Sequence, residues 1–164
     1  MNRSALDLGV RIERITDLPG DFDRIVYLAL QEMFGALRRM REEWDSGLNR
    51  FDRAGEAVFA AGAGSRLVGI CGLNRDPYAR SPGIGRVRHL YVDPAFRRRG
   101  IGRQLVSTVI DCAGLSFDRV RLRTSRADAD LFYVALGFRR VEGEPDVTHE
   151  RTAPVSTARG RSAT

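Results

Sequence analysis

The sequence predicts a single-domain α/β fold, and three observations support that prediction. The chain has 164 residues, 43% of them hydrophobic, which suits one domain around one sizeable core. Some segments repeat apolar residues at helical spacing, whereas others alternate or run continuously apolar as strands do. These segments follow one another as strand, two helices, hairpin, strand, helix, strand, helix and strand, an interleaving that suits a sheet flanked by helices.

The first third of the chain is expected to hold one strand and two helices. Residues 10–15 nearly alternate apolar and charged side chains before a DLPG turn, which is typical of a strand. Apolar residues recur with a 3.6-residue period over 21–40 and predict a helix with one buried face. A weaker helical pattern follows over 42–55.

The middle of the chain predicts a hairpin and a central strand. Two apolar runs over 56–64 and 65–76 meet at a Gly-Ser turn, as the strands of an antiparallel hairpin do. Residues 77–85 are expected to form a loop. The apolar, β-prone run over 86–92, which an Asp-Pro pair ends, suits a central position in the sheet.

The C-terminal half alternates helices with strands. The patterns predict, in order, a helix over 100–114, a strand over 117–124, a helix over 125–136 and a strand over 138–142. Ser125-x-x-Asp128 is typical of a capping box that opens the third of these elements, and Gly137 is expected to end it.

The chain is expected to form one domain over 1–150, followed by a disordered polar tail over 151–164. No apolar run is long enough to span a membrane, and the N-terminus lacks the apolar core of a secretory signal, so we expect a soluble cytoplasmic protein. Cys71 and Cys112 are the only cysteines, and the metal-binding motifs CxxC and HExxH are absent. We therefore expect neither a disulfide framework nor a metal site.

The net charge of +6 raises the possibility of a nucleic-acid partner. All 27 basic residues are arginines, and they are scattered along the chain except at 97–99. Several lie among acidic residues, which is typical of a solvated face. Nucleic-acid binding is thus a weaker alternative.

The stretch PAFRRRGIGRQ, residues 94–104, predicts a site for a phosphate. It places basic residues and Gly-x-Gly at the start of a helix, where unpaired backbone N–H groups and the helix dipole favour an anion. Gly100 would let the backbone approach a phosphate, and Gly102 would let the helix lie close to the sheet. A P-loop is disfavoured because the chain has no lysine, and a Rossmann fingerprint because Leu105 stands where its third glycine should be.

The segment LYVDPAFRRRGIGRQLV resembles the coenzyme A loop of the GNAT superfamily of N-acetyltransferases, whose pattern is Arg/Gln-x-x-Gly-x-Gly/Ala after a strand that ends in Val-x-Pro. Arg97, Gly100 and Gly102 occupy the motif positions. A second block, ADLFYVALGF, is similar to the family's A-x-x-F-Y-x-x-L-G-F helix and strand. Two motifs in the right order are more specific than either alone, and the resemblance covers roughly residues 10 to 150.

This resemblance implies a mixed, mostly antiparallel sheet that splays between its two central strands, with acetyl-CoA bound as co-substrate in the gap. The backbone groups of the strand that ends at Val92 would face the pantetheine, and those of the loop would hold the pyrophosphate. The implied cofactor-binding residues are Leu90, Tyr91, Val92, Arg97, Arg98, Arg99, Gly100, Ile101, Gly102, Arg103 and Arg126. Arg126 stands where an Asn is common in the family.

The implied reaction is direct attack of a primary amine on the thioester, which needs a base for the amine and an acid for the leaving thiolate. Tyr133 occupies the position of the family's usual proton donor. The strand carboxylate that serves as base in several members is replaced by Arg86. His89 on the same strand, His149 and a chain of water molecules are the remaining candidates for the base.

The acceptor pocket is expected between the first two helices and the hairpin. Its candidate residues are Glu32, Glu42, Glu43, Trp44 and Asp45, since carboxylates beside an aromatic would attract a cationic amine. The alternative is a solvated acidic helix face with one anchoring Trp.

The resemblance therefore favours an acetyl-CoA-dependent N-acetyltransferase that acts on a small-molecule or peptide amine. Homodimers are common among the proteins that the chain resembles. A non-catalytic acyl-CoA sensor is the alternative, because the strand carboxylate is missing.

Overall fold

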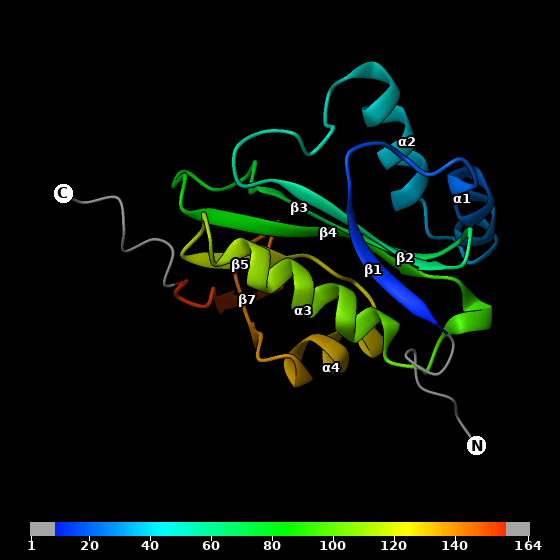
Figure 1. The fold of residues 1–164 in the computed structure, drawn as a ribbon. Helices are drawn as coiled ribbons and strands as arrows, with labels where there is room; N and C mark the ends of the chain where they lie inside the picture. The colour runs from blue at the N-terminus through cyan, green and yellow to red at the C-terminus, as the bar shows by residue number, and fades with distance from the viewer. Residues whose placement is uncertain (1–8, 157–164) are drawn as a thin grey trace.

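The computed structural model describes residues 9–156, which build a seven-stranded sheet in the order β1-β2-β3-β4-β5-β7-β6 (Figure 1). Neighbouring strands are antiparallel except β4 and β5, which are parallel. The prediction of a single α/β domain with a mostly antiparallel sheet is confirmed. The strands are β1 (Val10–Ile15), β2 (Ala57–Ala63), β3 (Arg66–Arg75), β4 (Ile84–Val92), β5 (Arg119–Leu122), β6 (Arg139–Arg140) and β7 (His149–Thr152).

Helices cover both faces of this sheet, as Figure 1 shows. The elements are α1 (Phe22–Gln31), α2 (Ala36–Ser46), a short 3-10 helix η2 (Pro94–Phe96), α3 (Ile101–Ala113) and α4 (Ala127–Ala135). The apolar sides of α1 and α2 pack on one face of the sheet, and α3 and α4 pack on the other. The strands alternate between the two cores: Val58 and Ala60 of β2 face α1 and α2, whereas Phe59 faces α3.

The predicted helix over 21–40 is wrong in one respect, because the chain breaks it into α1 and α2. Met33 adopts a left-handed backbone with φ of 59° and is 95% exposed, although it fits the apolar period. A second helix therefore begins at Ala36 and ends at Ser46, where Gly47 has a φ of 75°. The weaker helix predicted over 42–55 is wrong beyond Ser46, since a left-handed glycine at this position is a common helix stop.

Three smaller predictions also differ from the structure. The capping box does not form: Arg126 is the N-cap of α4 and makes no side-chain cap hydrogen bond. The strand predicted over 138–142 is reduced to β6. Strand β7 continues to Thr152 and Ala153 is buried, so the predicted tail begins too early, and its end at 157–164 lies outside the described residues. Gly137 ends α4 as predicted, with a φ of 85°.

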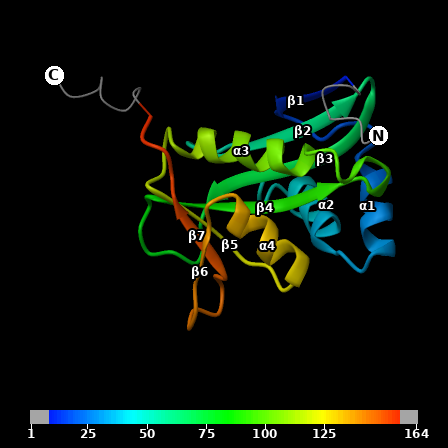
Figure 2. The same cartoon turned by 90° about the horizontal axis from the view of Figure 1, so that it is seen from below.

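The two parallel strands in the middle of the sheet separate along their length. They pair only at Ile84–Arg86 of β4 and at 119–121 of β5. In Figure 2, β5 and β7 run at a steep angle to β4, and α4 lies beside the opening. The sheet is therefore splayed, and the edge of β4 beyond Arg86 that faces β5 has no strand beside it within residues 9–156.

Candidate active site

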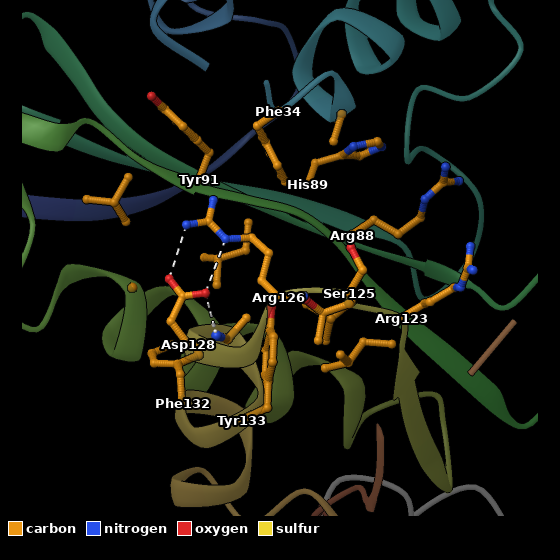
Figure 3. Close-up of a pocket in the computed structure, with 18 of the residues that line it drawn as sticks. Phe34, Arg88, His89, Tyr91, Arg123, Ser125, Arg126, Asp128, Phe132 and Tyr133 are labelled. Carbon is orange, nitrogen blue, oxygen red and sulfur yellow. Dashed lines mark hydrogen bonds and ion pairs between the residues drawn. The ribbon is translucent and has the colours of Figure 1, made fainter. Parts of the chain in front are cut away.

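A cavity of about 770 Å³ occupies the opening between β4 and β5 (Figure 3). Its wall consists of β4 from Arg86 to Val92, the loop and helix start over 96–103, the end of β5 with the segment that follows it, and α4. The α1–α2 connection and α2 close one end through Phe34, Ala36 and Arg39. The volume lies within the usual range for small-molecule sites.

The loop before α3 has the geometry of an anion site. Arg98 and Gly100 both adopt left-handed backbones, with φ of 60° and 80°, a conformation that occurs in backbone turns that bind anions. The first bond of the helix runs from Gln104 N–H to the Gly100 carbonyl, which leaves the N–H groups of Ile101, Gly102 and Arg103 pointing out of the helix start. A side chain at Gly100 would meet no atom within 4 Å, so the space beside it is open.

Gly102 has a different role from the one its sequence position indicates. A Cβ at this position would make only ordinary contacts, 3.6 Å from Val92 and 3.7 Å from Phe132. Packing of α3 on the sheet therefore does not require a glycine there. Because Gly102 lines the cavity, its missing side chain leaves room for a ligand.

The side chain of Arg97 is hydrogen-bonded to other residues of the protein. Its guanidinium forms two hydrogen bonds to Glu32, of 2.6 and 2.7 Å, and its Nε donates to the Val92 carbonyl at 2.9 Å. The Tyr91 hydroxyl donates to the same carboxylate at 2.8 Å. These bonds tie the loop to the end of α1, and the Arg97 hydrogen bonds hold the pKa of Glu32 below its usual value.

We expect Glu32→Gln to destabilise the protein by about 1 kcal/mol, because the paired side chains are only partly buried. Thermal unfolding measures this effect. Glu42→Gln is the matched control, because Glu42 pairs with Arg38 on an exposed helix face. Equal melting temperatures for the two variants would show that the Glu32–Arg97 pair does not stabilise the loop.

Other arginines near the loop are partly engaged as well. Arg126 pairs with Asp128 at 3.1 Å, and Figure 3 shows its side chain lying across the cavity. Arg99 stacks over the ring of Phe96 at 5.7 Å. Arg98 and Arg103 line the cavity beside the helix start.

Tyr133 projects from α4 into the cavity, with its ring pointing toward β4 (Figure 3). Edge contacts with Phe132 and Phe138 hold the ring, at centroid distances of 5.1 and 5.5 Å. Burial raises the pKa of its hydroxyl, with a smaller contribution from Cys71. A phenol is protonated at neutral pH even at its ordinary pKa near 10, so Tyr133 carries a proton that it can donate, and its burial makes the phenol a weaker acid than tyrosine in water.

His89 lies at an irregularity of β4. Ile70 and Gly72 of β3, two residues apart, pair with Tyr91 and Arg88, so β4 holds one extra residue between them. His89 has a φ of 58°, lies edge-on to Phe51 and points toward α2 in Figure 3. Burial, followed by the charges of Arg88 and Arg39, lowers its pKa to about 3. The backbone of Ala36 makes a weak polar contact, but neither ring nitrogen has a well-formed hydrogen bond to a described residue.

This lowered pKa predicts a pH dependence of stability. An unfolded histidine binds a proton below about pH 6.5, whereas the folded one stays neutral down to about pH 3. His89 thus contributes stability that is present above pH 6.5 and is lost as the pH falls toward 3. Chemical denaturation of the wild type and of His89→Gln should show slopes that differ by up to about 1.4 kcal/mol per pH unit in that range. Parallel curves would contradict a buried neutral His89.

The second histidine is held by the fold. His149 Nε2 lies 2.8 Å from Asp130, and Nδ1 lies 2.9 Å from the Thr148 hydroxyl. It is buried and does not line the cavity. Arg86 is also buried, 3.6 Å from Asp76 and hydrogen-bonded to the Asp146 carbonyl.

The predicted acidic acceptor pocket is not found in the described structure. Trp44 is buried in the core beneath α2, Glu42 and Asp45 are exposed, and Glu32 is paired with Arg97. None of these residues lines the cavity, nor does Glu43 or any residue of the hairpin. The alternative of a solvated helix face with an anchoring Trp describes this region better. No pattern in the sequence predicts that arginines line the cavity beside α2 instead.

Within residues 9–156, no helix is long and apolar enough to cross a membrane. The same residues contain no cluster of three side chains suited to a metal ion.

Comparisons with known proteins agree with this geometry. Residues 54–140, just over half of the chain, match the model of the acetyltransferase (GNAT) domain. The crystal structure of a presumed acetyltransferase from Exiguobacterium sp. 255-15 is 32% identical, with a TM-score of 0.77 over 87% of this chain and 93% of that one. A GNAT family N-acetyltransferase of Escherichia coli, solved in complex with CoA, shares the fold at 16% identity, with a TM-score of 0.66 over 88% of this chain and 82% of that one.

Two curated relatives come from mycobacteria. An uncharacterized protein of Mycobacterium leprae is 31% identical over 77% of this chain and 34% of its own length. The N-alpha-acetyltransferase RimI of Mycobacterium tuberculosis is 37% identical over 49% of this chain and 51% of its own length. The chain thus spans a third to a half of the curated relatives it matches. From the domain match, the motifs and the splayed sheet, we conclude that the chain belongs to the GNAT family of acetyltransferases.

Proposed function

We propose that the protein transfers an acetyl group from acetyl-CoA to a primary amine, by direct attack within a ternary complex. The observation that best supports the proposal is that three features border one cavity. They are the open edge of β4, the left-handed loop before α3 and the phenol of Tyr133. The name of the RimI relative, an N-alpha-acetyltransferase, supports an amine as the acceptor.

The chain offers a fitting surface for each part of acetyl-CoA. The pyrophosphate would lie on the backbone N–H groups between Arg98 and Arg103, because those of Ile101, Gly102 and Arg103 precede the first hydrogen bond of α3. The pantetheine would lie along β4 beside Leu90 and Val92, where no strand of residues 9–156 occupies the backbone edge. Arg97 would act by positioning the loop, because its guanidinium is bound to Glu32.

In the proposed transfer step, each protein group near the thioester has a distinct role. The amine nitrogen forms a bond to the acetyl carbon, and the carbon–sulfur bond then breaks. Backbone N–H groups at the irregularity around His89 and Leu90 lie outside the regular ladder and would polarise the acetyl carbonyl. Tyr133 would donate its proton to the departing thiolate, and solvent would restore the phenol.

The amine must lose a proton before or during the attack. His89 lines the cavity, but a pKa of about 3 makes it a weak acceptor for the proton of an ammonium group. We therefore favour proton transfer through water to solvent, with His89 as the second candidate for the base. The replacement of a strand carboxylate by Arg86 agrees with this choice.

Acetyl-CoA should raise the melting temperature of the protein, because a ligand that binds only the folded state stabilises it. Release of free CoA thiol in the presence of a panel of primary amines then tests catalysis. Protection without thiol release would favour a non-catalytic acyl-CoA sensor. Absence of protection would overturn both, and DNA binding that weakens steeply with salt would then favour the nucleic-acid alternative.

A further inference from the structure

We infer that the acceptor amine belongs to a molecule that also carries an anionic group, a carboxylate or a phosphate, close to its amine. This inference rests on the proposed acetyl transfer and names the class of its acceptor. It is carried by the arginines at the end of the cavity near α2. This α2 end is lined by Phe34, Ala36, Arg39, Tyr78, Arg86, Arg88, Arg123 and Asp146.

Strand alternation brings these arginines to one face of the sheet. Val87 and Leu122 pack into the core beneath α3, so Arg86, Arg88 and Arg123 face the opposite side, toward α2. Arg39 reaches the same end from α2. Figure 3 shows Arg88 and Arg123 extending toward one end of the cavity, while Arg126 and Asp128 lie at the other.

Their charges are only partly balanced. Arg86 has Asp76 at 3.6 Å, and Arg88 has Glu43 at 3.8 Å. Arg39 and Arg123 form no ion pair with an acidic side chain among residues 9–156. Asp146 is the carboxylate that lines this end, and its backbone carbonyl already accepts from Arg86. The α2 end therefore presents more positive than negative charge to a ligand.

The excess of positive charge at the α2 end favours some amines over others through electrostatic attraction and repulsion. A diamine or a lysine-like side chain would bring like charge to Arg39 and Arg123, which is unfavourable. A carboxylate or phosphate can instead accept paired hydrogen bonds from a guanidinium fork. An acceptor with its amine toward the thioester and its anion toward these arginines would satisfy both. This arrangement replaces the cationic acceptor that the acidic residues of α2 predict from sequence.

Matched acceptors test the inference through the rate of CoA thiol release. β-Alanine is compared with β-alaninamide, and O-phosphoethanolamine with ethanolamine, so that each pair differs by one anionic group. We expect kcat/KM to be at least about tenfold higher for the anionic member of one pair or both, which is the effect of about 1.4 kcal/mol. The pair that responds distinguishes carboxylate from phosphate. Equal rates within both pairs would overturn the inference.

Variants of Arg39 and Arg123 test whether these two arginines cause the preference for an anionic acceptor. In the double variant Arg39→Gln and Arg123→Gln, the preference for the anionic member should fall about tenfold, while the affinity for acetyl-CoA stays unchanged. Arg38→Gln is the matched control, since Arg38 neighbours Arg39 in α2 but does not line the cavity. A preference that survives in the double variant would overturn the inference.

A binding experiment separates failure of this inference from failure of the proposed acetyl transfer. If no amine releases thiol, binding to the CoA-saturated protein is measured with glutarate and with pentane-1,5-diamine, which are of matched length and opposite charge. Glutarate should bind to the wild type at least tenfold more tightly than pentane-1,5-diamine does. It should also bind less tightly to the double variant than to the wild type. Equal or weaker binding of glutarate would overturn the inference about the anion, whatever the outcome for catalysis.

Discussion

Replacing Tyr133 with Phe should lower kcat for acetyl transfer by roughly 100-fold, at the lower end of what general acid catalysis contributes. The phenol points into the cavity from α4 and carries its proton at neutral pH, as any tyrosine with a pKa of 10 or above does. Removing the hydroxyl leaves the ring and its edge contacts with Phe132 and Phe138 in place. The loss should therefore appear in the chemical step, with the dissociation constant for acetyl-CoA unchanged.

Single-turnover kinetics with the best acceptor and calorimetric titration of acetyl-CoA separate these two effects. Tyr27→Phe is the control, because Tyr27 is an exposed residue of α1 outside the cavity. An unchanged kcat in Tyr133→Phe would remove this residue as the acid. A lower kcat that is fully accounted for by weaker acetyl-CoA binding would assign Tyr133 to positioning of the co-substrate.

Much of this site could be predicted from the sequence, because its parts are local. The loop that we propose as the anion site contains a Gly-x-Gly segment at a helix start, and Gly100 does adopt the left-handed backbone that a glycine favours. The position of Tyr133 on a helix follows from its motif, which lies within α4. The pairing of β2 with β3 follows from two apolar runs and a short turn.

The rest depends on contacts between distant segments, which single-sequence patterns do not encode. Arg97 lies within the segment that predicts a phosphate site, yet its guanidinium binds Glu32, 65 residues earlier. The break between α1 and α2 was missed because Met33 fits the apolar period while facing solvent. The same break places Arg39 at the α2 end of the cavity. The composition of the chain therefore could not predict that this end carries a positive charge.

Gly100→Asp should weaken acetyl-CoA binding by roughly 100-fold more than Gly100→Asn does. Asp and Asn have nearly equal size, and both tolerate the left-handed backbone that residue 100 requires, with a φ of 80°. Each variant should therefore lose a similar stability without ligand, about 1 kcal/mol for placing a side chain on a left-handed backbone. The Asp variant alone adds a negative charge where the pyrophosphate is proposed to lie. Two like charges about 4 Å apart near a protein surface repel by up to about 4 kcal/mol, and the exposure of the loop reduces this to about 2.7 kcal/mol.

Titration with acetyl-CoA and with 3′-dephospho-CoA tests where this repulsion arises. If the diphosphate lies on the loop N–H groups, the penalty of Gly100→Asp relative to Gly100→Asn should persist with 3′-dephospho-CoA, because both ligands keep the diphosphate. A penalty that disappears with 3′-dephospho-CoA would place the 3′-phosphate at residue 100 instead. Equal affinities of the two variants for both ligands would contradict an anion site at the start of α3, even though the loop turns its N–H groups outward.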